Sequence, residues 1–264
     1  VQLYNLLRGL RYQGRWFYGM QAITAEQVPV ADWTIQIEKC RAVIAAQGGD
    51  EPTYRSGGEI AVGVPIADAM EALLDACQGR ITETGGVYKL SVGQPDAVAA
   101  TFSDDDILSS EEQSFTPFFG LADTVNGISA KYPDPAQGWQ IETAPPLNNS
   151  DYEAEDGARR LMVDVQFDLV PYGEQVQRLM LAALNEARRA RRHTLSLPPR
   201  FWALEPGDVV QWTSARNGYG SKLFRGDGVM DQPNADVLVD LTEFDTADYD
   251  FDTNVDFTPV GGGS

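Results

Sequence analysis

Cysteine and histidine are scarce in this chain, which has only Cys40, Cys77 and His193 among its 264 residues. Two cysteines cannot form the disulfide framework of a small secreted domain, and a single histidine disfavours a histidine-based metal site. We expect no cofactor. Both cysteines fall on the apolar faces of predicted helices, where we interpret them as small buried hydrophobes. A disulfide between them is possible, but the sequence does not support one.

Long hydrophobic runs are also missing. No apolar run approaches the roughly 20 residues that cross a bilayer, so the sequence predicts no membrane span. Neither an initiator Met nor a signal peptide precedes Val1, and we expect the chain to be part of a longer protein. Residues 261–264 read as a flexible Gly-Ser tail. The rest is long enough for two domains with proper cores.

Positive charge is scarce in two stretches, and the net charge is −19. Residues 96–157 hold thirteen acids and one base, and residues 226–264 hold ten acids and no base. Bases are in excess only in residues 158–225. Affinity for nucleic acid without sequence preference needs cationic neutralisation, which this chain does not offer. The acidic surface either serves solubility alone or lets DNA slide past without sticking.

Apolar spacing predicts three amphipathic helices, over residues 32–47, 65–78 and 172–192. A short strand is predicted over 59–63, and a hairpin over 80–92 that turns at Gly85-Gly86. Residues 1–95 are therefore expected to form a small α/β domain.

The remainder alternates short strand-like segments with polar loops, including a polar stretch at 150–160. Strands are expected near residues 115–121, 125–132, 139–143, 161–170, 209–214, 222–230 and 237–244. We predict that residues 96–260 form an antiparallel β-barrel with the third helix packed against it. The fold class is thus α+β.

The stretch from Arg188 to Trp212 is the most informative. The third helix ends with four arginines, Arg188, Arg189, Arg191 and Arg192. Their positive charge suits the negative end of the helix dipole. We expect them to contact acidic residues of a neighbouring chain. Leu195 and Leu197 alternate with polar residues as in an edge strand, which the following prolines terminate. Pro206, Gly207 and Asp208 predict a tight turn between strands. No catalytic group is evident here.

Four other motifs have competing interpretations. Asp104-Asp105-Asp106 could supply one carboxylate of a glycosidase pair, but a loop entering a helical turn is favoured. The alternating acids of residues 248–256 could bind Ca²⁺, yet they depart from the EF-hand pattern, and an edge strand or extended tail with inward Tyr249, Phe251 and Val255 is favoured. His193 lacks the Gly-x-Ser-x-Gly context of a hydrolase triad. Arg225-Gly-Asp227 is better explained as a turn than as an adhesion tripeptide.

A set of short segments is spread in order along nearly the whole chain. They are Tyr4-Asn-Leu-Leu, Asp32-Trp33, Glu51-Pro-Thr-Tyr-Arg55, Leu73-Leu74, Gly79, Gly85-Gly86-Val-Tyr-Lys-Leu, Asn126-Gly-Ile, Tyr132-Pro-Asp-Pro135, Gln175 and Arg178, Leu204-Glu-Pro-Gly-Asp208, Lys222-Leu-Phe224 and Glu243-Phe-Asp-x-x-x-Tyr249. Together these segments resemble the tail-hub proteins of siphophages and gene transfer agents, including the lambda-type host-specificity protein.

The resemblance implies a non-enzymatic fragment of a homotrimeric hub at the tail tip of a virion or phage-like particle, assembled in the host cytoplasm. Residues 1–95 would be the accessory domain and 96–260 one tube-like barrel domain in a ring around the DNA exit channel. Neighbouring distal-tail and tip or fibre proteins would be its partners, and DNA would pass without specific binding. The alternatives are a cell-wall glycosidase and an adhesion module that binds carbohydrate through Trp139, Trp202 or Tyr219.

Overall fold

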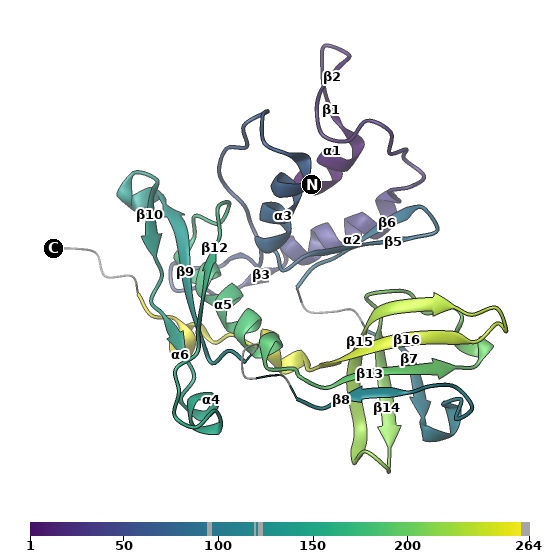
Figure 1. Ribbon diagram of the computed structural model, residues 1–264. Helices are drawn as coiled ribbons and strands as arrows, with labels where there is room; N and C mark the ends of the chain where they lie inside the picture. Colours follow the sequence, from purple (N-terminus) through teal and green to yellow (C-terminus); the bar gives the residue numbers. More distant parts are fainter. Residues whose placement is uncertain (94–96, 119, 121–123, 260–264) are drawn as a thin grey trace. The chain divides into compact units, whose positions relative to one another are not determined.

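The computed structural model describes residues 1–93, 97–118, 120 and 124–259 (Figure 1). The structure is mixed α+β, as the sequence predicts. It divides into two compact units: the first unit comprises residues 1–93, 125–184 and 249–264, and the second unit comprises residues 94–124 and 185–248. In the described part of the chain, no helix combines the length and the apolar character that a membrane span requires.

The amino-terminal part of the first unit confirms two predicted helices and the predicted hairpin. Gly85 and Gly86 both have positive φ, which the two-residue turn of that hairpin requires. The helix expected over 32–47 ends at Arg41, because Ala42 turns to extended backbone and a short strand follows. The strand expected over 59–63 is not formed. The elements are α1 (Gln2–Arg8), β1 (Leu10–Tyr12), β2 (Arg15–Tyr18), α2 (Val30–Arg41), β3 (Val43–Ile44), β4 (Glu51–Pro52), α3 (Ile66–Asp75), β5 (Arg80–Thr84) and β6 (Val87–Ser91).

The rest of the first unit is built on a four-stranded sheet. Strand β9 pairs with β10 and β11 in antiparallel fashion and with β12 in parallel. The stretch 150–160, expected to be loop, contains the short helix α4, whose first N–H groups are capped by the Asn149 side chain. The elements are β9 (Gly127–Asp134), β10 (Gln140–Thr143), β11 (Leu147–Asn148), α4 (Ser150–Glu155), β12 (Met162–Gln166), α5 (Gly173–Ala187) and α6 (Thr253–Asp256).

Helix α5 is the third helix of the sequence prediction, but its packing partner differs from the expected one. Its apolar stripe includes Val176, Leu179 and Met180, all essentially inaccessible to solvent. These side chains share a core with Ile128 and Tyr132 of β9. The expectation that the helix packs against the barrel is therefore wrong: its apolar face is satisfied by the four-stranded sheet.

The second unit contains a six-stranded sheet in the order β7-β14-β15-β16-β13-β8. The predicted strands over 209–214 and 237–244 are confirmed with the same bounds. The predicted closed antiparallel barrel is not confirmed. Among the described residues the sheet is open, with β7 and β8 as outer strands, and β7 runs parallel to β14. The strands are β7 (Val98–Ser103), β8 (Ser114–Thr116), β13 (Arg192–Leu197), β14 (Val209–Ser214), β15 (Tyr219–Asp231) and β16 (Val237–Phe244).

Strand β13, predicted as an edge strand, lies inside the sheet. It pairs with β16 along its whole length and with β8 from Arg192 to Thr194. Strand β8, which is distant in sequence, is the second pairing partner, and the alternation of residues within β13 could not reveal it. Pro198 and Pro199 end the strand as expected, and Pro199 opens a short 3₁₀ turn.

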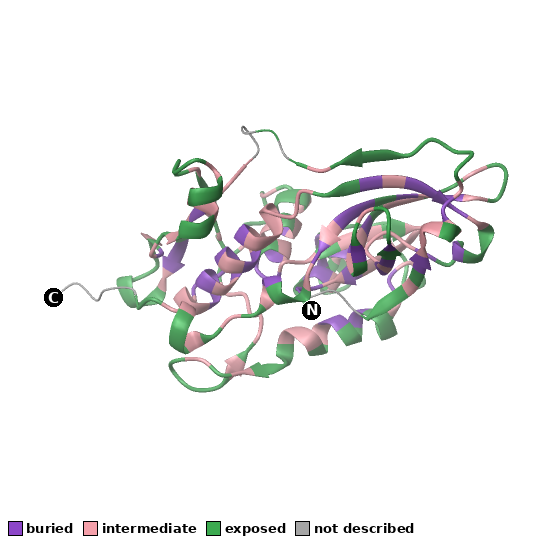
Figure 2. Ribbon diagram, turned by 90° about the horizontal axis from the view of Figure 1, so that it is seen from below, coloured by how far each residue is buried: buried purple, intermediate pink, exposed green. Residues whose placement is uncertain are grey.

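One face of the six-stranded sheet holds an aromatic core. Phe102, Trp212, Tyr219 and Phe224 pack together with ring centroids 5.3 to 5.7 Å apart where neighbours touch. Along β14 and β16 most buried positions are separated by intermediate or exposed ones, and Figure 2 colours the described residues by their burial. Alternation of this kind is typical of a sheet with one face buried and one face exposed.

Candidate functional site

The turn predicted at Pro206–Asp208 connects the described 3₁₀ turn at Pro199–Phe201 to strand β14. Gly207 has φ of 100°, a conformation that favours glycine, and the Asp208 carboxylate accepts a hydrogen bond of 2.9 Å from the Glu205 N–H. Gly207 donates to the Gly226 carbonyl at 2.7 Å, and Gly226 donates back to the Asp208 carbonyl at 2.8 Å. The turn is thus anchored to β15.

The four arginines of the predicted cluster follow α5 rather than forming its last turn. The helix ends at Ala187, and the N–H groups of Arg188 and Arg189 close it by bonding to Asn185 and Glu186 carbonyls at 3.1 and 3.0 Å. Arg192 opens strand β13. The arginines therefore span the connection from helix to sheet.

Arg189 is held by acids of its own chain. Its guanidinium binds the Asp248 carboxylate through two hydrogen bonds, one of them 2.7 Å long from Nε to Oδ2. Asp245 lies 3.3 Å and Glu243 3.7 Å from the same group. The bonds to Asp248 raise the pKa of Arg189, so the guanidinium stays charged.

Glu243 gathers further cations at the edge of this network. Its Oε1 lies 3.3 Å from Arg191 and 2.5 Å from Lys222, and its side chain is 9% exposed. Arg188 and Arg192 also have interaction partners in the protein. The geometry ties the arginine segment to β15, β16 and the residues after β16. The expected contact with a neighbouring chain stays a prediction.

His193 lies in the aromatic core of the second unit. Its ring stacks on Phe115 with centroids 4.3 Å apart, and Nε2 lies 2.9 Å from the Tyr219 hydroxyl. Burial, helped by the positive charges of Arg191 and Arg216, lowers the pKa of His193 to about 4. The imidazole is therefore neutral at pH 7, and the geometry gives it a packing role.

Two of the three carboxylates proposed for a glycosidase, those of Asp104 and Asp106, form hydrogen bonds or ion pairs within the protein. Asp104 accepts hydrogen bonds from the Trp212 indole at 3.2 Å and the Arg216 N–H at 3.4 Å. Burial acts to raise the pKa of Asp104, but these bonds and one from Ser214 outweigh it, and the pKa is lowered. Asp106 caps the 3₁₀ turn of residues 104–106 and forms an ion pair with Arg200. A general acid needs the opposite shift.

The Arg225-Gly-Asp227 tripeptide lies within strand β15, beside a bulge, and not in a turn as expected. Arg225 is only 15% exposed and pairs with Asp227 and Glu186 at 3.3 and 3.6 Å. Asp227 also accepts a hydrogen bond from Thr242. Both charged groups are therefore already paired within the chain, although the Asp227 side chain is 47% exposed, and a receptor would have to displace these contacts.

The acidic segment 248–256 is helical at both ends rather than extended. Asp252 caps α6, and Val255, expected to pack inward, is 78% exposed. In the described ranges, no group of three or more His, Cys, Asp or Glu side chains could hold a metal ion.

The aromatic residues of the adhesion alternative differ in their exposure to solvent. Tyr219 is buried, whereas Trp139 and Trp202 are 56% and 61% exposed. Trp139 belongs to the first unit and Trp202 to the second. The Trp202 indole donates to Asp231 at 2.5 Å.

An ion-pair cluster in the first unit brings together residues about 120 positions apart in the sequence. Arg178 of α5 binds Glu51 at 3.0 Å and the Thr53 carbonyl at 2.9 Å, and Glu51 also pairs with Arg55. The fully buried Gln175 bonds to both the N–H and the carbonyl of Arg55. Sequence reasoning singled out these residues only as points of resemblance and missed that they meet.

The outer strands β7 and β8 leave one side of each strand without a ladder partner in the described part of the sheet. All three residues of β8 are exposed, and Phe115 is 47% exposed although its ring stacks on His193. On β7, Val98 is 41% exposed. Exposed apolar edge strands are typical sites of pairing with another chain.

Comparison with known proteins identifies the family. Residues 65–229 match the family described as putative phage tail protein. The match covers more than half of the chain, and the chain belongs to this family. Its place is therefore in the tail of a virion or a phage-like particle.

Individual relatives are more distant. Baseplate hub protein pb3 of Escherichia phage T5 is 22% identical over 187 residues, which cover 68% of this chain and 19% of that protein. A chain in the virion of a native gene transfer agent particle aligns with a TM-score of 0.57 and 18% identity, over 70% of this chain and 40% of that chain. This chain thus spans about a fifth of the length of pb3.

Proposed function

We propose that this member of the putative phage tail protein family is a structural, non-catalytic part of a tail hub, present as a homotrimer around the DNA exit channel. The observation that carries the proposal is the open six-stranded sheet, whose outer strands β7 and β8 are exposed and partly apolar. Repeated head-to-tail pairing of such edges closes into a ring when the rotation between copies is right. A ring leaves none of those edges exposed.

The charge of the second unit supports a passive role toward DNA. Its residues include seventeen acids and eight bases. Several bases are already engaged with acids, above all Arg189 and Arg191. A wall of this composition repels the phosphate backbone, so DNA passes it without being bound.

The same proposal gives each of the other parts of the chain a role in the hub. Residues 1–95 act as the accessory domain, and the tube-like domain lies within residues 96–260. Distal-tail proteins on one side and tip or fibre proteins on the other are the neighbours of the hub. Arg188, Arg189, Arg191 and Arg192 contribute to contacts between copies.

The experiment charges the two sheet edges in the full-length protein. Val98→Lys combined with Phe115→Lys places a cation on each outer strand, where charge opposes edge pairing. Met230→Lys is the matched control, because Met230 is 61% exposed on the interior strand β15 of the same sheet. Light scattering and electron microscopy report mass and ring formation.

We expect trimeric rings from the unmodified protein and the Met230→Lys control, and smaller species from the edge variant. A full-length protein that forms no rings contradicts the hub. Rings that persist with both edges charged contradict the role of β7 and β8.

A further inference from the structure

Cys40 and Cys77 come from separate elements of the first unit and meet at one place. Cys40 lies in the last turn of α2, and Cys77 follows α3. Tyr54 links their surroundings: its N–H donates to the Cys40 carbonyl at 3.0 Å, and its hydroxyl donates to the Gln78 side chain at 3.3 Å. Tyr54 therefore bonds both to the backbone of Cys40 and to the side chain of the residue that follows Cys77.

The end of strand β6 provides a second connection. The Val92 N–H donates to the Gln36 side chain of α2 at 3.2 Å, and the next N–H, of Gly93, donates to the Cys77 carbonyl at 3.0 Å. Two consecutive backbone groups thus hold α2 and Cys77 beside one another.

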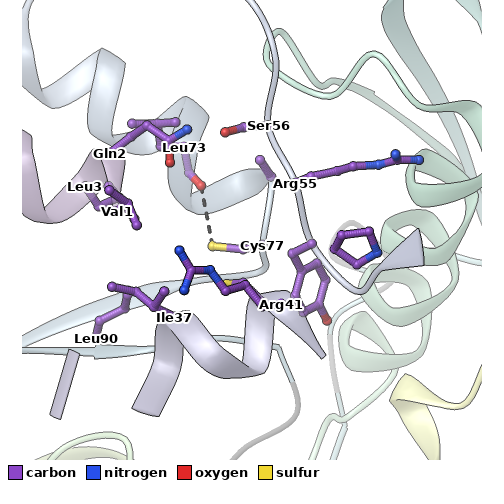
Figure 3. Close-up of a pocket in the computed structure, with 14 residues that line it drawn as sticks. Val1, Gln2, Leu3, Ile37, Arg41, Arg55, Ser56, Leu73, Cys77 and Leu90 are labelled. Carbon is purple, nitrogen blue, oxygen red and sulfur yellow. Dashed lines mark hydrogen bonds between the residues drawn. The ribbon is translucent and has the colours of Figure 1, made fainter. Parts of the chain in front are cut away.

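Both cysteines line a cavity of about 290 Å³ that also includes Leu73 and Leu90 (Figure 3). Both are free thiols, and each lies near enough to the other to shift its pKa. Cys77 is buried and also approaches the Leu73 carbonyl at 3.5 Å, whereas Cys40 is half-buried. The cavity therefore gives a small reagent a way to reach the thiol pair.

We propose that Cys40 and Cys77 form a disulfide in the folded protein when it moves from a reducing to an oxidising environment. The chain is a tail protein, and a virion leaves the reducing cytosol in which its proteins are made. The bond would join the end of α2 to the segment after α3 once assembly is complete. This inference rests on the thiol geometry and does not depend on the ring.

The chemistry is thiol–disulfide exchange with a small disulfide as the oxidant. The thiolate of Cys40 attacks one sulfur of the oxidant, its S–S bond breaks, and one thiol leaves as a mixed disulfide forms at Cys40. The sulfur of Cys77, after losing its proton, then attacks the Cys40 sulfur and displaces the second thiol. Two protein thiols are oxidised, and one small disulfide is reduced to two thiols.

The order of attack follows from the two environments. The hydrogen bond from Cys77 lowers the pKa of Cys40, while that bond and burial raise the pKa of Cys77. Cys40 is also the more exposed of the two. It is therefore the first nucleophile, and Cys77 is the resolving thiol.

The test treats the folded protein with 2-hydroxyethyl disulfide and follows it by intact-mass and peptide mass spectrometry. We expect a mass loss of about 2 daltons, no remaining free thiol, and a peptide that links residues 40 and 77. The melting temperature of the oxidised protein should rise by about 5–10 °C, because the bond closes a long loop.

Two variants separate the roles of the thiols. Cys77→Ala should stop at a stable mercaptoethanol adduct on Cys40, and Cys40→Ala should react slowly or not at all. Neither should gain melting temperature on oxidation. Retention of both thiols, an adduct on each cysteine, or only disulfides between chains would overturn the proposal.

Discussion

His193 should make the stability of the second unit depend on pH in mildly acidic solution. The pKa of its imidazole in the folded protein is about 4, against 6.5 ordinarily, because the ring is buried among aromatic side chains. At a pH between these two pKa values, His193 is protonated in the unfolded chain but not in the folded protein. Stability is therefore lost as the pH falls from about 6.5, and the loss is complete below about 4.

The size of the effect follows from the two pKa values. A difference of this size corresponds to at most about 3 kcal/mol, and to about 2 kcal/mol between pH 7 and pH 5. The 6% exposure of His193 supports a value near this limit. If neighbouring side chains repacked so that water reached the imidazole, the pH-dependent loss of stability would be smaller.

The assay uses the fact that His193 is the only histidine in the chain. An NMR titration of its Cε1–H signal gives the folded-state pKa without assignment. Urea unfolding at pH 7 and pH 5, followed by tryptophan fluorescence, gives the stability change. His193→Gln is the control: it keeps a polar partner for the Tyr219 hydroxyl, and subtraction removes the titration of the carboxylates.

We expect the unmodified protein to lose about 2 kcal/mol more than His193→Gln between pH 7 and pH 5. An NMR pKa near 6.5 would refute the reasoning, since it would mean that water reaches the ring. Equal losses in both proteins would refute it as well.

Three substitutions test other parts of the structure by urea unfolding. Gly207→Val should lower the free energy of unfolding by roughly 1–3 kcal/mol, because a β-branched residue opposes a φ of 100°. The control Gly220→Val should lower it by less than about 1 kcal/mol, because Gly220 has open space around it and no positive φ. Equal losses in the two variants would rule out backbone strain at Gly207. Gln175→Leu should cost about 2–4 kcal/mol, since it leaves the Arg55 N–H and two buried carbonyls unpaired, and a near-neutral result would contradict the hydrogen bonds assigned to it. Asp248→Asn should lower the free energy of unfolding by about 2 kcal/mol, and this loss should change little with salt, because the Asp248 side chain is only 4% exposed. A loss that disappears in 1 M salt would indicate a solvated ion pair instead.

The local elements could be read from the sequence where a few neighbouring residues decide the structure. The hairpin at Gly85-Gly86 follows from two residues that tolerate positive φ, and strands β14 and β16 follow from short segments rich in β-branched and other apolar residues. The turn at Pro206–Asp208 follows from residue chemistry in the same way. The resemblance carried by short ordered segments led to the tail-protein family, which the family match confirms.

Partners across the sequence could not be predicted in this way. The apolar stripe of α5 was visible, but a stripe does not say which apolar surface covers it, and that surface is β9. Alternation in residues 195–197 did not show that β8 would pair with the start of the same strand. The ion pairs of Arg178 with Glu51 and of Arg189 with Asp248 join residues that are 127 and 59 positions apart.

Composition and local pattern by themselves determined the acidic character of this protein, its mixed helices and strands and its tight turns, and short ordered segments carried its resemblance to a family of tail proteins. Only the tertiary structure decided that the large sheet is open and which charged side chains pair with one another. It also decided that two cysteines far apart in the sequence line the same cavity. The physical reason is range: φ preferences and alternation act over a few residues, whereas hydrogen bonds, ion pairs and core contacts form between any segments that the folded chain brings together.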